Sequence, residues 1–133
     1  MKAVERKLLP KNERLFLQKD IDRLFHTGRS FISYPLRIVF LQNVCNHASE
    51  AGVSILVSVP KKRIRLAVNR NRIKRLIRES YRLNKNETVE GCKQKGKQLH
   101  IAFMYIGNDI MKYADIEKAV LKTLKNILIT HTE

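Results

Sequence analysis

The chain has 133 residues and a mass of 15.5 kDa, which fits one domain, and its apolar fraction of 44% is sufficient for a folded core. Its charge is unusual: 27 Lys and Arg against 12 Asp and Glu give a net charge of +15, which predicts a polyanionic partner. No apolar run is long enough to span a bilayer, no secretory signal is visible, and the two cysteines, Cys45 and Cys92, lack metal-ligand spacing. We therefore expect a cytoplasmic protein without a disulfide framework, a membrane partner, a bound metal or a small-molecule ligand.

The first half of the chain predicts a helix followed by strands. Residues 1–14 are polar and basic, and we interpret them as a flexible basic N-terminal arm. From about residue 19 apolar residues recur at helical spacing up to Gly28, which is expected to end the helix in the left-handed conformation. Strand-like stretches follow at 31–34 and 36–44, separated by a proline.

The second half of the chain predicts, in order, a strand, a helix, a second strand and a last helix. Alternating apolar residues predict a strand over 53–59, and residues 68–84 form the strongest helix candidate. Residues 84–97 are polar and contain two glycines, so we expect a loop there. The apolar run 99–106 indicates a buried strand, and 116–128 is amphipathic with helical period.

The element order is therefore α-β-β-β-α-β-α within a single domain over residues 15–130. Helices packed on a small sheet are the economical way to bury these apolar faces, which gives an α+β fold.

The helix candidate at 68–84 separates its charge from its apolar side chains. Residues 61–82 carry ten basic residues and one acid, Glu79, for a local charge of +9. At about 100° per residue, one arc of the helix holds Ile73, Leu76, Ile77 and Leu83. The opposite arc holds Arg70, Asn71, Lys74, Arg75, Arg78 and Arg82. Arginine dominates it, and its planar guanidinium binds phosphate oxygens in pairs. A solvated helix face is the alternative, but such faces usually carry more acids, so nucleic-acid binding is favoured.

The same residues resemble a known motif. The spacing R-N-R-x-K-R-x-x-R is present in full and is typical of the bacterial ribonuclease P protein family; it is formed by Arg70, Asn71, Arg72, Lys74, Arg75 and Arg78. The resemblance extends to the stretch Ser58–Arg63 upstream and to Leu24–Gly28 at the end of the first helix, and it covers about residues 9–128. Arg65 and Leu66 depart from the family pattern, so the turn before the basic helix is expected to be shaped differently.

The resemblance implies a fold and a function. The implied fold is a two-layer α/β sandwich, similar to a domain of a ribosomal protein, with a left-handed βαβ crossover. The implied function is the protein subunit of ribonuclease P, an endoribonuclease that removes the 5′ leader of precursor tRNA. Catalysis is then carried by the RNA subunit with magnesium, and this chain supplies no catalytic side chain and binds no cofactor. The expected residues for the catalytic RNA are Lys61, Lys62, Arg63, Arg65, Arg70, Asn71, Arg72, Lys74, Arg75, Arg78 and Arg82.

A cleft between the first helix and the sheet is implied to hold the leader. The candidate residues there are Phe25, Phe31, Tyr34 and Arg37. Core packing is the alternative for the aromatic residues, and period-two alternation does not allow all four to face one cleft. We favour Tyr34 and Arg37 as exposed contacts because burial would penalise their polar ends.

An independent nuclease and a general RNA-binding module are the alternatives. A metal-dependent nuclease needs clustered carboxylates, but Asp20 and Asp22 point about 200° apart on a helix and the four histidines lack ligand spacing. A ribosomal protein or RNA chaperone would also explain the high net positive charge of the chain. Only the arginine-rich motif favours ribonuclease P over such a module.

Overall fold

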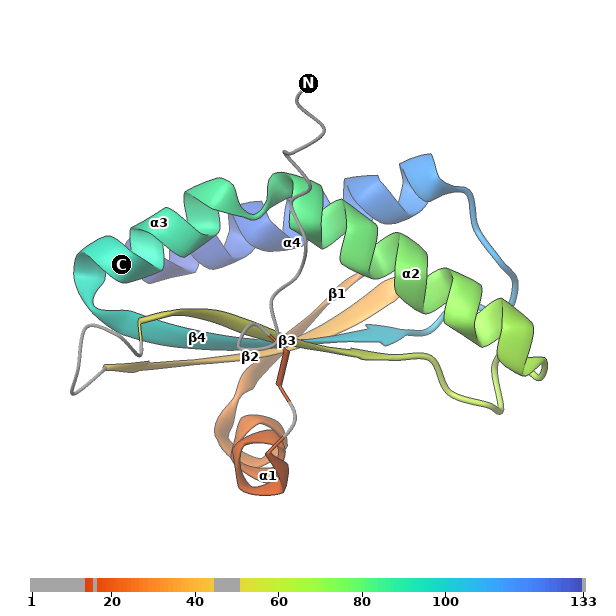
Figure 1. The fold of residues 1–133 in the computed structure, drawn as a ribbon, viewed down its shortest axis with the longest axis horizontal. Coiled ribbons are helices and arrows are strands. Elements are labelled where there is room, and N and C mark those ends of the chain that lie inside the picture. The colour runs from red at the N-terminus through yellow and green to blue at the C-terminus, as the bar shows by residue number, and fades with distance from the viewer. Residues whose placement is uncertain (1–13, 16, 45–50, 133) are drawn as a thin grey trace.

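The structure is a four-stranded sheet with helices on both faces (Figure 1). The computed structural model describes residues 14, 15, 17–44 and 51–132, with side chains described as far as Ile127. The elements are α1 (Gln18–Thr27), β1 (Arg29–Ser33), β2 (Leu36–Val44), β3 (Gly52–Ser58), α2 (Ala67–Asn84), α3 (Asn86–Lys95), β4 (Lys97–Tyr105) and α4 (Tyr113–Thr132). The predicted arm lies outside the described residues except for Arg14, which bridges to Ile55 on β3.

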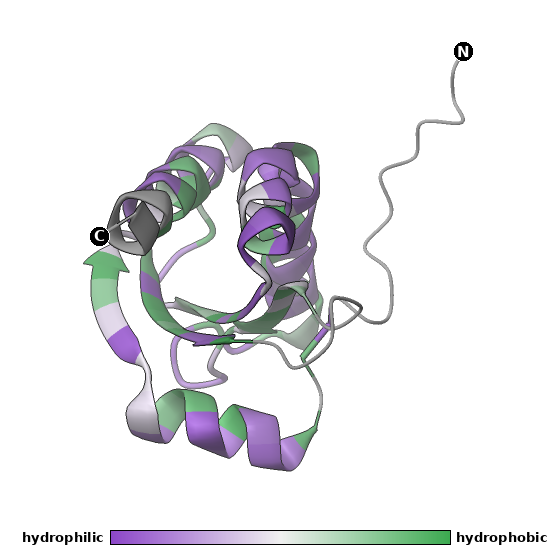
Figure 2. Cartoon of the chain, turned by 90° about the vertical axis from the view of Figure 1, so that its left-hand side faces the viewer, coloured by the Kyte–Doolittle hydropathy of each residue, from purple (hydrophilic) through white to green (hydrophobic). Residues whose placement is uncertain are grey.

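The sheet has the strand order β1-β2-β4-β3. β2 is antiparallel to both β1 and β4, whereas β3 and β4 are parallel neighbours joined through α2 and α3. Figures 1 and 2 together show that the chain leaves β3, crosses the helical face and returns to β4 in the left-handed sense. Such crossovers are rare, since right-handed ones are the strong default. The mixed α/β fold and the left-handed crossover expected from the resemblance are therefore confirmed, and α1 adds a further layer on the other face of the sheet.

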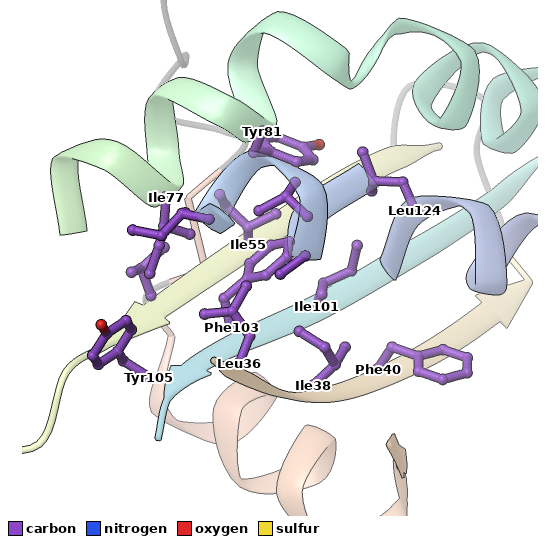
Figure 3. Packing of buried hydrophobic residues seen from close by; sticks show 14 of the residues in the cluster. Leu36, Ile38, Phe40, Ile55, Ile77, Tyr81, Ile101, Phe103, Tyr105 and Leu124 are labelled. Carbon is purple, nitrogen blue, oxygen red and sulfur yellow. The ribbon is translucent and has the colours of Figure 1, made fainter. Parts of the chain in front are cut away.

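The two faces of the sheet bury cores of different size. α2, α3 and α4 cover one face, and Figure 3 shows Tyr81 of α2 and Leu124 of α4 above Ile55, Ile101 and Phe103 of the sheet. Period-two alternation provides this surface, because every second residue of β3 is buried: Val53, Ile55 and Val57. The outer sides of the helices are largely hydrophilic (Figure 2).

α1 packs alone on the opposite face of the sheet (Figures 1 and 2). Its one fully buried residue, Leu24, packs with Val39 of β2 and Ala102 of β4, and Leu15 joins the same cluster. The backbone N–H of Leu15 donates to the carbonyl of Ile55 over 2.8 Å, so the chain is tied to β3 just before α1 begins. Ile21, Leu41, Leu56 and Met104 are partly buried around this cluster, which is smaller than the core on the other face.

The predicted loop over 84–97 is wrong, because most of it forms α3. Thr88 and Cys92, four residues apart, are buried, and Val89 packs against the main core. The sequence does not indicate this helix, because its buried residues are few and polar residues surround them. Gly96 ends α3 in the left-handed conformation, with φ 63°.

Gly28 does not adopt the left-handed conformation expected of it, since its φ is −74°. A Cβ at this position would lie 2.4 Å from the carbonyl oxygen of Leu24 and 2.9 Å from that of Phe40. The glycine is therefore required by the close approach of α1 to the sheet.

Candidate nucleic-acid interface

α2 is anchored by a narrow apolar stripe that leaves its basic side outside. Ile73, Ile77, Ser80 and Tyr81 are its buried residues, and Leu76 packs partly against the core. Leu83, expected on the apolar arc, is 43% exposed, because Ser80 and Tyr81 fill the buried positions of that turn. The orientation of the helix is nevertheless the one that its periodicity predicts.

Three arginines of the motif lie open on the outer side of α2. Arg72, Arg75 and Arg78 are exposed, as is Asn71, which directly precedes Arg72 in the motif. Within the described part of the chain, none of these three guanidinium groups forms an ion pair. No acidic residue lies in the first turn of α2. The charge of this surface is thus not neutralised by the protein itself, and it is available to phosphate groups.

Two other basic residues of the helix already have partners inside the protein. The Arg82 guanidinium donates from Nη2 to Glu79 Oε1 over 2.7 Å and to Oε2 over 2.8 Å. Arg70 Nη1 donates to the carbonyl oxygens of Ile64 over 3.0 Å and Arg65 over 2.7 Å. The ion pair of Arg82 and the carbonyl contacts of Arg70 were not predicted from the sequence, although residues spaced as Glu79 and Arg82 are neighbours on a helix.

The loop before α2 extends the basic surface beyond the helix N-terminus. Lys61, Lys62 and Arg65 are exposed there, and Arg63 Nη1 donates to Asn108 Oδ1 over 3.3 Å. Leu66 is the N-cap, and its apolar side chain has no acceptor for the N–H groups of the first turn. A hollow of about 460 Å³ lies between this loop and the β4–α4 loop.

The four leader candidates are divided between the two faces of the sheet. Phe25 on α1 is 44% exposed and Tyr34, in the β1–β2 turn, is 63% exposed, so neither is a core residue. Arg37 is exposed on the α1 face, next to Val39 and opposite its cross-strand partner Ile32. Phe31 instead packs against the main core, half-buried, with its ring edge-on to Phe40 at 5.9 Å, and it lines the same hollow as Arg37.

Ile32 is the residue of this region that sequence reasoning missed. It is 65% exposed, and alternation along β1 places it on the opposite face from Phe31. Arg37, Ile32 and Ile106 line a hollow of about 690 Å³ together with Arg63. This hollow connects the α1 face with the loop that precedes α2.

His100 is buried beneath α1. It lies on β4 opposite Leu41 of β2, is 3% exposed, and its Nδ1 has no hydrogen-bond partner within the described residues. Burial lowers the pKa of His100; the nearby Asp20 opposes this shift and Arg23 adds to it. In the described part of the chain no three His, Cys, Asp or Glu residues are grouped as metal ligands would be. There is also no described helix long and apolar enough to cross a membrane.

Comparison with known proteins identifies relatives along nearly the whole chain. The family model for ribonuclease P matches residues 9–128. The ribonuclease P protein component of Porphyromonas gingivalis is 41% identical over 119 residues, which cover 90% of this chain and 85% of the relative. That of Clostridium botulinum is 34% identical over 115 residues and 94% of its own length.

Solved structures with the same fold are also ribonuclease P proteins. The Staphylococcus aureus protein superposes with a TM-score of 0.64 at 23% identity, covering 86% of this chain and 94% of that chain. The Thermotoga maritima protein gives 0.63 at 22% identity, covering 86% and 96%. The sequence matches and the fold agree, and the chain belongs to the ribonuclease P protein family, whose members bind RNA and serve in tRNA processing.

Proposed function

We propose that this chain binds the catalytic RNA of ribonuclease P through α2 and the loop that precedes it. The observation that carries the proposal is the exposure of Arg72, Arg75 and Arg78 without an ion-pair partner in the described residues. Each guanidinium can donate two parallel hydrogen bonds to a phosphate, and each phosphate contact releases bound counterions from the RNA. Asn71 adds a neutral donor and acceptor that suits a ribose hydroxyl or a base edge.

We further propose that the α1 face holds the 5′ leader of precursor tRNA. Phe25 and Tyr34 supply exposed aromatic rings on which unpaired bases can stack, and Arg37 supplies a cation for the backbone. Phe31 packs half-buried against the core on the other side of the sheet, and it also lines the hollow that contains Arg37. The hollow that Arg37 shares with Arg63 allows one RNA chain to run from the leader surface towards α2.

In this proposal the contribution of the chain is electrostatic and positional. The RNA partner performs the hydrolysis with magnesium, and the protein reduces repulsion between phosphates and holds the substrate in place. Because the protein neutralises part of the phosphate charge, the complex holds its substrate more tightly and needs less magnesium to do so.

Reconstituted cleavage of precursor tRNA tests the proposal. We expect no cleavage by the protein alone, slow cleavage by the RNA alone, and faster cleavage with both, most clearly at low magnesium. Cleavage by the protein alone would show a nuclease. Equal rates with and without the protein, despite RNA binding, would show a general RNA-binding module such as a ribosomal protein or RNA chaperone.

A further inference from the structure

Arg70 differs from the other arginines of the basic helix in where its side chain goes. It is half-buried, whereas Arg72, Arg75 and Arg78 are exposed. One nitrogen, Nη1, donates to two successive carbonyl oxygens, those of Ile64 and Arg65, at 3.0 and 2.7 Å. The guanidinium thus lies over the turn that leads into α2 and is directed back along the chain.

The loop over residues 60–66 depends on few other contacts. The carbonyl of Pro60 accepts from the backbone N–H groups of Arg63 and Ile64, at 3.1 and 3.2 Å, and Ile64 is buried in the core. The Arg63 side chain donates from Nη1 to Asn108 Oδ1 over 3.3 Å. Beyond Ile64 the next residues, Arg65 and Leu66, are exposed, and the N-cap makes no side-chain hydrogen bond. Among the described residues, Arg70 is therefore the one whose side chain hydrogen-bonds to the carbonyl oxygens of Ile64 and Arg65, just before α2 begins.

We propose that Arg70 is a positioning residue of the RNA interface: it fixes the loop so that Lys62 and Arg65 meet the RNA, and it makes no phosphate contact itself. This proposal rests on the proposed function, because it assumes that the loop and α2 bind RNA together. A guanidinium engaged with two carbonyls has fewer donors left for phosphate. Its removal also leaves both carbonyls without their partner, which loosens the loop.

A double-mutant cycle in the full-length chain tests the proposal, with the ribonuclease P RNA of the same organism as the probe. Arg70→Met is introduced into three backgrounds: wild type, a loop variant with Lys62→Ala and Arg65→Ala, and a helix variant with Arg75→Ala and Arg78→Ala. The helix variant is the matched control, since it removes the same charge from α2 at positions remote from the loop. Coupled residues are distinguished from independent ones by such cycles.

We expect Arg70→Met to weaken RNA binding at least about threefold in the wild-type and helix-variant backgrounds, and to have little effect in the loop variant. Equal losses in all three backgrounds would overturn the proposal in favour of direct phosphate contact. If the loop and helix variants themselves bind RNA as tightly as wild type, the proposed function fails instead.

Amide exchange of the free protein gives a second, independent measurement. Arg70→Met should speed exchange at Arg63 and Ile64, and leave the buried turns of α2 at Ile73 and Ile77 protected. Unchanged exchange in the loop would overturn the positioning role. Should the Met variant fail to fold, Arg70→Lys serves in both experiments, because it keeps the charge but replaces the planar guanidinium by a shorter side chain, which weakens the two carbonyl contacts. Equal losses of Arg70→Lys in the three backgrounds would again contradict the proposal.

Discussion

Gly28 illustrates how one residue determines the attachment of α1 to the sheet. We predict that Gly28→Ala lowers the free energy of unfolding by about 1–3 kcal/mol, because its Cβ would lie 2.4 Å from the carbonyl oxygen of Leu24 in α1 and 2.9 Å from that of Phe40 in β2. Urea denaturation measures the loss, and Ser30→Ala, at an exposed site of β1, should change stability by less than about 0.5 kcal/mol. Equal stability of wild type and Gly28→Ala would show that the close approach relaxes without cost.

Arg72 and Arg75 are predicted to act through the shape of their guanidinium groups as well as through charge. Arg→Lys at either position keeps the net charge but loses one of two paired hydrogen bonds to phosphate, so RNA affinity should fall by roughly 1 kcal/mol or more. Equilibrium binding at fixed salt measures the loss. Lys118→Arg, at an exposed site of α4, is the control and should leave affinity unchanged. Wild-type affinity of both Lys variants would mean that charge alone is sufficient.

At the scale of elements, the α1 face is predicted to recognise the leader. Tyr34→Ala with Arg37→Ala should weaken holoenzyme binding to precursor tRNA by roughly 1–3 kcal/mol, the magnitude of one lost base stack. Binding of a substrate without a leader, and of the catalytic RNA, should hardly change. Lys118→Ala, which removes one exposed charge from the opposite side of the sheet, is the control. Equal losses with and without a leader would assign these residues to the fold or to the RNA interface.

The elements also show what the sequence can predict. The basic helix was predictable because its apolar residues recur at helical period while its arginines cluster on the opposite arc. α3 was not, because its buried stripe of Thr88 and Cys92 is short and largely polar. Alternation separates Phe31 from Ile32, but which of them faces the core depends on how β1 pairs with β2. The partners of Arg70 and the left-handed crossover arise from tertiary structure, and periodicity indicates neither.

At the scale of the whole molecule, stability should depend on pH through His100. Because burial lowers its pKa in the folded state, the unfolded chain binds the proton more readily. The stability contributed by neutral His100 is therefore present above its ordinary pKa of about 6.5 and is lost as the pH falls below it. The difference in free energy of unfolding between wild type and His100→Gln should shrink between pH 7 and pH 5. A difference independent of pH would contradict this assignment.

The net charge of +15 is spread over more than one surface, so the central claim is that α2, and not charge in general, binds the RNA. The direct test compares the salt dependence of RNA affinity for two triple variants that remove the same charge. One replaces Arg72, Arg75 and Arg78 of α2 by Ala, and the other replaces Lys118, Lys122 and Lys125, which are exposed at similar spacing on α4. The account predicts that the α2 variant reduces the slope of log K against log salt by about 2–3, and that the α4 variant leaves the slope close to wild type. Equal slopes for the two variants would contradict it.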